Sequence, residues 1–188
     1  SAASDVYKRQ QVSHVEVNGK VLGVVGAGTI GREVIKVAQA LGMKVLAYTR
    51  TPRADEDNLK YVSLEELLKQ SDYISLHCPL TPQTRHMINK ETIAMMKPTA
   101  YIINTGRGAL IDEPALIEAL KEGRIAGAGL DVQETEPPVQ DNPLYDMPNV
   151  ILTPHMGWKG LETRQRLVSI LAANIQAFDE GRPQNVVS

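Results

Sequence analysis

The segment between Val21 and Gly31 constrains the fold of this chain more than any other part of its sequence. It opens with the apolar run VLGVV, which is typical of a strand covered on both faces of a sheet. Glycines with the spacing G-x-G-x-x-G follow, at Gly26, Gly28 and Gly31, and a helical pattern begins directly after them. In this order the first glycine makes a tight turn, the second lets the backbone approach a pyrophosphate, and the third permits close packing of helix on strand. The segment therefore predicts a helix N-terminus that binds the phosphates of a dinucleotide.

The rest of the chain alternates short β-rich runs with helical patterns. We expect strands at residues 21–25, 44–48, 73–77, 100–103, 126–130 and 150–152, and helices at residues 30–41, 63–68, 91–96, 113–121 and 161–180. The first helix shows one apolar stripe of the kind that packs on a core, made of Ile30, Val34, Val37, Ala38 and Leu41. Ser63 with Glu66 forms the pattern of a capping box.

This alternation predicts the α/β class and a Rossmann-type, doubly wound parallel sheet. Such a sheet binds ligands at the carboxyl ends of its strands, in the crevice where the strand order reverses. The residues that directly follow each strand are therefore the candidates for function.

Composition excludes several classes of function. The 188-residue chain is 43% hydrophobic and 22% charged with a net charge of −2, which gives no electrostatic reason to expect nucleic acid or an anionic membrane as partner. No apolar run approaches the roughly 18 residues that span a bilayer, and the N-terminus lacks the apolar core of a signal peptide, so we expect a cytoplasmic protein. A single cysteine, Cys78, excludes an internal disulfide and a multi-cysteine metal site, and we expect no metal.

The chain divides into a short leader and one domain. Residues 1–11 show neither helical nor strand periodicity, and we interpret them as a disordered or non-native leader. Residues 12–188 are expected to form a dinucleotide-binding domain, with residues 161–188 as its final helix and tail.

The end of the second expected strand bears on the choice of cofactor. An NAD enzyme usually has Asp or Glu there to bind the ribose 2′-hydroxyl, whereas this chain has Thr49, followed by Arg50 and Arg53. Absence of the carboxylate removes repulsion of a 2′-phosphate, and a nearby arginine could pair with that phosphate. NADP is therefore as plausible as NAD, or slightly favoured, unless both arginines are only solvated loop charges.

Charged side chains follow three later strands. Arg107 lies between two glycines after the fourth strand, Asp131 and Glu136 follow the fifth, and His155 follows the last. A guanidinium, a carboxylate and an imidazole on neighbouring strand ends would converge on one crevice. This set suits reduction of a 2-oxo acid, because arginine binds carboxylate and carbonyl, histidine donates a proton, and a carboxylate holds the imidazole in register.

At these residues the chain resembles the D-isomer-specific 2-hydroxyacid dehydrogenase family, over essentially all of residues 17–187. The matching stretches, in the family's order and spacing, are GVVGAGTIG, SLHCPLTPQTRHMIN, MKPTAYIINTGRGALID, AGAGLDVQETEPP, NPL, NVILTPHMG and NIQAFDEGRPQNVV. The resemblance implies that Arg107 binds the substrate, that His155 is the general acid/base with Glu136 as its partner, and that Asp131 positions the nicotinamide carboxamide. The cofactor-binding residues expected from the glycine turn and the resemblance together are Gly26, Gly28, Thr29, Ile30, Gly31, Thr49, Arg50, Cys78, Pro79, Thr84, Thr105, Gly106, Asp131 and Gly157.

Within the family, three stretches look most like glycerate dehydrogenases and hydroxypyruvate reductases. They are VLAYTRTPR, EPP-x-x-x-NPL, and the histidine followed by Met-Gly-Trp. The resemblance implies hydride transfer between NAD(P)H and hydroxypyruvate/D-glycerate or glyoxylate. Two alternatives stay open: a phosphoglycerate or D-lactate dehydrogenase, and a non-catalytic dinucleotide sensor similar to the family's corepressors.

The resemblance also implies a larger protein. Family members are typically longer, with a substrate domain that begins before the stretch matched here and to which residues 161–188 would return. We therefore expect this chain to bind dinucleotide but to turn over substrate poorly, and we expect a homodimer.

The other three histidines are less promising as catalytic groups. We expect His77 to be a hydrogen-bonded core or rim residue and His86 to lie on the surface, and we give His14 no catalytic role. Trp158 is expected either to shape the substrate pocket or to pack at the start of the final helix.

Overall fold

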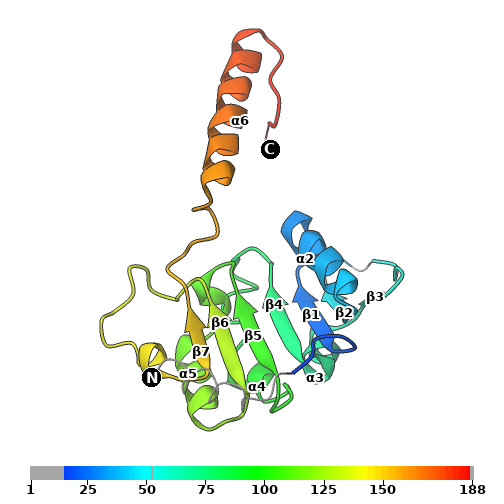
Figure 1. Cartoon of the computed structure of the whole chain (residues 1–188), viewed down its shortest axis with the longest axis vertical. Coiled ribbons are helices and arrows are strands. Elements are labelled where there is room, and N and C mark those ends of the chain that lie inside the picture. Colours follow the sequence, from blue (N-terminus) through cyan, green and yellow to red (C-terminus); the bar gives the residue numbers. More distant parts are fainter. Residues whose placement is uncertain (1–14, 52, 187–188) are drawn as a thin grey trace, which may run out of the picture.

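The computed structural model describes residues 15–51 and 53–186, so the expected leader at residues 1–11 and His14 lie outside the described residues. The described chain forms a parallel sheet of seven strands in the order β3-β2-β1-β4-β5-β6-β7 (Figure 1). The strand order reverses between β1 and β4, which confirms the predicted α/β, Rossmann-type, doubly wound sheet. The strands are β1 (Val21–Val25), β2 (Lys44–Tyr48), β3 (Leu59–Tyr61), β4 (Tyr73–Leu76), β5 (Tyr101–Asn104), β6 (Gly127–Leu130) and β7 (Val150–Leu152).

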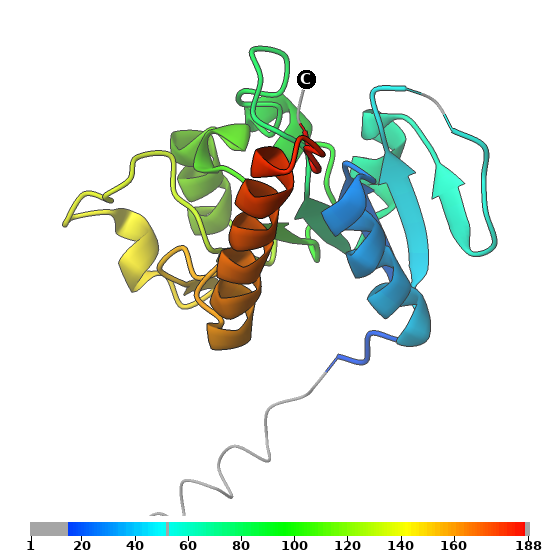
Figure 2. The ribbon, with the colours of Figure 1, turned by 90° about the horizontal axis from the view of Figure 1, so that it is seen from above.

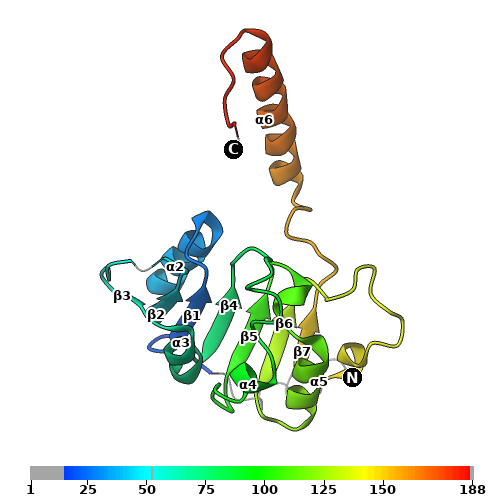
Figure 3. The ribbon, with the colours of Figure 1, turned by 180° about the vertical axis from the view of Figure 1, so that it is seen from behind.

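Helices cover the two faces of the sheet unequally. Along β1, Leu22 and Val24 belong to the core beneath α2, whereas Val25 belongs to the larger core beneath α3, α4 and α5. The opposite views in Figures 1 and 3 show α2 on one face and these three helices on the other. The helices are α2 (Thr29–Ala40), α3 (Leu64–Gln70), α4 (Lys90–Ile93), α5 (Glu113–Lys121) and α6 (Leu161–Asp179), with 3-10 turns η1 (Gly108–Leu110) and η2 (Pro143–Asp146).

The predicted packing stripe of α2 is only partly right, because Ala38 is buried and the half-buried Val34 packs against the core, whereas the rest of the stripe does not. The buried residues of α2 are Gly31, Ile35 and Ala38, so only Ala38 of the predicted set is buried. The reason is that Gly31, which has no side chain, lets the helix approach the turn closely and centres the contact on its own face. Three members of the predicted stripe are instead exposed: Ile30, Val37 and Leu41.

Several predicted boundaries also differ. β4 ends at Leu76 instead of residue 77, and the helix expected at residues 91–96 is the single turn Lys90–Ile93. Strand β3 was missed because three residues, in which buried Leu59 precedes exposed Lys60, are too few to show a period.

Only half of the predicted capping box at α3 forms. The Ser63 hydroxyl accepts from the Glu66 backbone N–H at 3.1 Å, but the Glu66 carboxylate accepts from the Gln70 side chain instead. A reciprocal box occurs at α4, between Asn89 and Thr92.

Helix α6 stands away from the sheet in Figures 1 and 3, and Figure 2 views the molecule from the side of α6, which is drawn in orange to red. None of its residues is buried, although its sequence is rich in large apolar side chains. In the described part of the chain, no helix is long and apolar enough to cross a membrane.

Candidate active site

The turn between β1 and α2 is built on two glycines that no other residue could replace without strain. Gly26 has a φ of +100°, and a Cβ atom there would lie 2.7 Å from the Cys78 backbone nitrogen beyond β4. At Gly31 a Cβ atom would lie 2.1 Å from the Gly26 carbonyl oxygen. At Gly28, by contrast, a Cβ atom would meet nothing within 4 Å, so this position faces open space. The turn therefore leaves its backbone accessible at the middle glycine.

The first turn of α2 fits an anionic group. Gly28 is the N-cap and supplies no side-chain hydrogen bond, and the first turn contains no acidic residue. The first N–H groups of a helix have no partner within it and carry the positive end of its dipole. The residues of this turn, Gly28, Thr29 and Ile30, are also exposed, so the cradle fits the pyrophosphate of a dinucleotide.

The end of β2 carries no carboxylate, as the sequence indicates. The Thr49 hydroxyl donates to the Thr51 carbonyl oxygen at 2.7 Å, and Arg50 is exposed beside it. The nearby Glu56 accepts from the Arg32 guanidinium at 3.0 Å, so its charge is partly compensated by α2. This arrangement leaves a cation, and no carboxylate, directly after the strand.

His155 and Glu136 meet beyond the ends of β7 and β6. His155 Nδ1 lies 2.8 Å from Glu136 Oε2, and Glu136 Oε1 accepts from the Gln133 backbone N–H at 3.2 Å. The hydrogen bond from His155 lowers the pKa of the Glu136 carboxyl below its ordinary value and outweighs the opposing effect of burial. With Nδ1 held by the carboxylate, Nε2 of His155 is the nitrogen available for proton exchange.

The backbone at His155 is held in an unusual conformation. Its φ is +50°, in the left-handed region that few non-glycine residues adopt and that often marks functional sites. The Asp131 carboxylate supports this segment, since it accepts from the Thr153 hydroxyl and from the backbone N–H groups of Met156 and Gly157, at 2.8 and 3.1 Å. Burial raises the pKa of Asp131, but these hydrogen bonds outweigh burial and bring the pKa below its ordinary value. Asp131 thus anchors the histidine segment, and its contact with nicotinamide stays a prediction.

Arg107 lies at the end of the neighbouring strand, β5. The fully buried Asn104 fixes the segment, because its amide donates to the Arg107 carbonyl at 2.9 Å and its carbonyl accepts from the Gly106 N–H at 3.1 Å. The Arg107 side chain is exposed, as is Thr105. Sequence reasoning missed Asn104, although a polar residue that ends an apolar strand was a usable signal.

A cavity of about 340 Å³ opens beside the imidazole–carboxylate pair. Its lining includes Gln133, Glu136, Tyr145, Leu152 and His155. The pair therefore borders open volume instead of being enclosed in the core.

The turn after β4 lies at the same carboxyl edge of the sheet, beside Gly26. The Thr84 hydroxyl donates to the Pro79 carbonyl at 2.7 Å, which ties this turn together. Burial raises the pKa of the Cys78 thiol, so this side chain is poorly suited to nucleophilic attack, and its contact with the cofactor stays a prediction. His77 contacts the Ser75 hydroxyl at 2.8 Å and burial lowers its pKa, in agreement with the predicted hydrogen-bonded core or rim residue.

Two further predictions can be compared with the geometry. His86 is half-buried and its Nε2 lies 2.6 Å from Glu134 Oε1, so it does not lie on the open surface as expected, because that carboxylate draws it inward. The Trp158 ring lies under the Arg164 guanidinium of α6, 5.2 Å from the ring centroid, as expected for packing at the helix start. Among the described residues, no cluster of three or more His, Cys, Asp or Glu side chains is arranged to hold a metal.

Comparison with known proteins identifies the family of this chain. Residues 2–157 match the family described as D-isomer specific 2-hydroxyacid dehydrogenase, NAD binding domain. A hydroxypyruvate reductase of Blautia hydrogenotrophica is 50% identical over 176 residues, which are 93% of this chain and 55% of that protein. A glycerate dehydrogenase of Methylorubrum extorquens is 49% identical over 92% of this chain and 54% of that protein. The chain thus spans about half the length of the curated relatives it matches.

Solved structures agree with this result. A D-lactate dehydrogenase with NAD+ from Lactobacillus jensenii matches with a TM-score of 0.88 and 35% identity, over 99% of this chain and 62% of that one. An acyclic imino acid reductase in complex with NADPH and D-Arg matches with a TM-score of 0.85 and 36% identity, over 100% of this chain and 62% of that one. Similar folds therefore occur with both nicotinamide dinucleotides.

Proposed function

Because this chain belongs to the D-isomer specific 2-hydroxyacid dehydrogenase family, whose NAD-binding domain it matches, we propose that its protein transfers a hydride between NAD(P)H and a small 2-oxo acid. The observation that carries the proposal is the 2.8 Å contact between His155 Nδ1 and Glu136 Oε2, on the sheet edge that also presents Arg107. Hydroxypyruvate/D-glycerate or glyoxylate is the proposed substrate, because relatives near half identity are named for these acids.

The three side chains have tasks that suit their chemistry. The Arg107 guanidinium binds the carboxylate and carbonyl oxygens of the oxo acid through paired N–H donors. His155 donates a proton from Nε2 to the carbonyl oxygen as that oxygen becomes a hydroxyl. Glu136 stabilises the imidazolium that precedes this transfer. The bound nicotinamide supplies the hydride for the second carbon.

The dinucleotide would be held along the carboxyl edge of the sheet. The N-terminus of α2 would bind the pyrophosphate, because its first N–H groups are exposed and uncapped. The turn after β4 and the segments after β5 and β6 would line the nicotinamide half. The residues proposed for this lining are Cys78, Pro79, Thr84, Thr105, Gly106, Asp131 and Gly157.

We propose that the site accepts NADPH as well as NADH, through the exposed Arg50 after β2. The Arg50→Ala variant is expected to raise the Kd of NADPH about tenfold, as loss of one charge-assisted hydrogen bond does, and to leave the Kd of NADH within about twofold. Fluorescence titration of both cofactors measures this difference, with Arg53→Ala as the matched variant further along the loop. A decisive preference of the unmodified protein for NADH would contradict the proposed role of Arg50.

Helix α6 is proposed to pack against the substrate domain of the full-length protein. Seven of its large apolar side chains are at least 45% exposed, more than a helix of a finished domain leaves in water: Leu161, Leu167, Val168, Ile170, Leu171, Ile175 and Phe178. From the family resemblance we also propose that the protein is a homodimer and that it is cytoplasmic. Sedimentation equilibrium tests the homodimer directly.

Steady-state oxidation of NADH and NADPH tests the proposed function. The full-length protein is assayed with hydroxypyruvate, glyoxylate, phosphohydroxypyruvate and pyruvate. Preferred turnover of hydroxypyruvate or glyoxylate supports the proposal, whereas preference for either other acid identifies a phosphoglycerate or D-lactate dehydrogenase. Tight cofactor binding without turnover of any of the four acids would contradict the enzyme and favour the dinucleotide sensor.

A further inference from the structure

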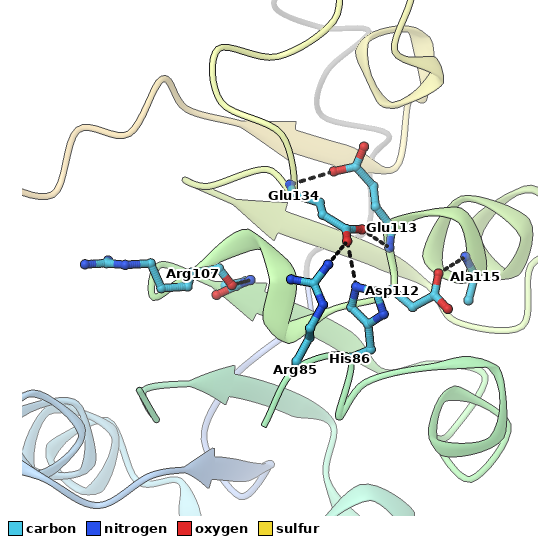
Figure 4. Close-up of polar contacts among 8 residues, drawn as sticks. Arg85, His86, Arg107, Asp112, Glu113, Ala115 and Glu134 are labelled. Carbon is cyan, nitrogen blue, oxygen red and sulfur yellow. Dashed lines mark hydrogen bonds and ion pairs between the residues drawn. The ribbon is translucent and has the colours of Figure 1, made fainter. Parts of the chain in front are cut away.

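Glu134 lies at the meeting point of three segments next to the proposed active site. It is two residues from Glu136 in sequence, and its side chain is only 22% exposed. Its Oε1 lies 2.6 Å from His86 Nε2 and accepts from the Arg85 guanidinium at 3.3 Å. Figure 4 shows both of these side chains reaching Glu134 from the chain segment before α4.

A second set of contacts ties Glu134 to the start of α5. The Glu134 backbone N–H donates to Glu113 Oε2 at 3.1 Å, and Glu134 Oε2 accepts from the Glu113 backbone N–H at 3.4 Å. The other oxygen of Glu113 accepts from the buried Asn142 amide at 2.7 Å, and this amide also donates to Gln133 Oε1 at 3.0 Å. Residues before and after Glu136 in the sequence, Glu134 and Asn142, are thereby both bonded to Glu113 at the N-terminus of α5.

The segment that carries Arg107 joins the same assembly. A Cβ atom at Gly108 would lie 1.9 Å from the Gln133 carbonyl oxygen, so the two backbones are in direct contact there. The His86 N–H donates to the Ala109 carbonyl at 2.8 Å, which links the third segment to the residues just after Arg107. In Figure 4 the Arg107 side chain points away from this cluster, so Arg107 is held through its backbone.

The backbone at His86 indicates that these contacts are structurally important. Its φ is +50°, a strained conformation for a non-glycine residue that persists only where neighbours enforce it. Two hydrogen bonds hold His86 in this conformation: its backbone N–H bonds to the Ala109 carbonyl and its ring to the Glu134 carboxylate.

We propose that Glu134 is a positioning residue, which joins the Arg107 and Glu136 segments and thereby sets the His155–Glu136 pair in register with the Arg107 guanidinium. The inference rests on the proposed function for its catalytic consequence. Its structural part, that Glu134 fastens the segment of Glu136 to His86 and to the start of α5, stands on the contacts alone.

The activity test compares Glu134→Ala with Glu134→Gln in the full-length protein. Glu134→Ala is expected to lower kcat for hydroxypyruvate on the order of 100-fold, the loss that a displacement of about 1 Å causes, with the Kd of NADH unchanged. Glu134→Gln, which keeps one acceptor oxygen, is expected to recover most of that loss. Glu118→Gln is the matched control, because Glu118 also joins α5 to α4, through Lys90 at 3.3 Å, but does not contact the Glu136 segment.

A double-mutant cycle with Glu136→Gln separates positioning from general stability. If Glu134 acts through Glu136, replacing Glu134 costs little further activity once Glu136 is a glutamine. Fully additive losses in the double variant would overturn the proposal.

A readout independent of activity keeps the inference distinguishable from the proposed function. The carboxyl carbon of Glu136 is followed by NMR against pH in the 188-residue chain. The pKa of Glu136, lowered mainly by the hydrogen bond from His155, is expected to rise toward its ordinary value in Glu134→Ala and to stay unchanged in Glu118→Gln. If Glu134→Ala does not fold, Glu134→Gln is expected to give a smaller rise. An unchanged Glu136 titration in every folded Glu134 variant overturns the inference, whether or not the protein reduces any acid.

Discussion

Replacing Gly31 by alanine tests the geometry of the phosphate turn. A Cβ atom there would lie 2.1 Å from the Gly26 carbonyl oxygen, whereas real Cβ contacts essentially never fall below 3.0 Å. The start of α2 must therefore move from β1 by about 0.9 Å, because a close-packed backbone does not compress. This movement loosens the packing of Ile35 and Ala38, which are 3% and 4% exposed.

The expected cost follows from measured effects of overpacking. Inserting a methyl group into a packed site costs about 1–3 kcal/mol of the free energy of unfolding. For a domain of this size each kcal/mol lowers Tm by about 2–4 °C, so Gly31→Ala is expected to lower Tm by roughly 2–12 °C. The Kd of NADH should rise as well, because the N-terminus of α2 is displaced.

Gly28→Ala is the matched control within the same turn. Its Cβ atom meets nothing within 4 Å and its φ is −78°, so the free energy of unfolding should fall by no more than about 1 kcal/mol, the cost of alanine at an N-cap. The methyl group would nevertheless stand where we propose that the pyrophosphate binds, and the Kd of NADH is expected to rise about tenfold or more.

Thermal unfolding gives the Tm of each variant, and fluorescence titration gives the Kd of each for NADH. We expect Gly31→Ala to lose stability and affinity, and Gly28→Ala to lose affinity while it keeps most of its stability. A Gly31→Ala variant as stable as the unmodified chain, or a Gly28→Ala variant destabilised equally, would refute this expectation.

Three further predictions concern a charge, a catalytic group and the chain alone. The Asp72 carboxylate accepts hydrogen bonds from Lys97 Nζ and from the Val21 backbone N–H, each at 2.8 Å. Burial raises the pKa of Asp72, but these bonds outweigh burial, so the pKa lies below its ordinary value. Asp72 therefore stabilises the fold above about pH 4, and this stabilisation is lost as the pH falls through the folded-state pKa. Urea unfolding should therefore show Asp72→Asn about 1–2 kcal/mol less stable than the unmodified chain at pH 7, with the difference closing as the pH falls below the folded-state pKa of Asp72; a difference independent of pH contradicts this. Glu136→Gln should lower kcat about 100-fold with the Kd of NADH unchanged, measured by stopped flow and titration, and normal turnover would remove Glu136 from the mechanism. The 188-residue chain alone should bind NADH yet reduce hydroxypyruvate far more slowly than the full-length protein, and equal turnover would contradict a need for a substrate domain.

Much of the fold could be predicted because it depends on local patterns. The apolar runs of β1, β2 and β7 and the start of α5 at Asp112 were readable from strand composition and from helix-start residues. The packing face of α2 was not, because the apolar stripe at Ile30 and Val37 is stronger than the signal from Gly31. Close approach through a glycine is a property of two elements together, so one helical pattern cannot reveal it.

The site shows the same division. That His155 and Glu136 follow neighbouring strands could be predicted, and the structure brings the two side chains together. The left-handed backbone at His155 and the anchoring of its segment by Asp131 could not, because they arise from contacts between loops. Glu134 was missed for the same reason, since one glutamate in a loop between others carries no period or spacing.

The most direct test of the whole account is NADH oxidation by the full-length protein on addition of hydroxypyruvate or glyoxylate, compared with the His155→Gln variant. We expect the unmodified protein to turn over one or both acids. His155→Gln is expected to lose about 100-fold or more in kcat, with the Kd of NADH unchanged. Equal turnover by the two proteins would contradict the assignment of His155 as the proton donor. Absence of turnover in both would contradict the proposed dehydrogenase itself.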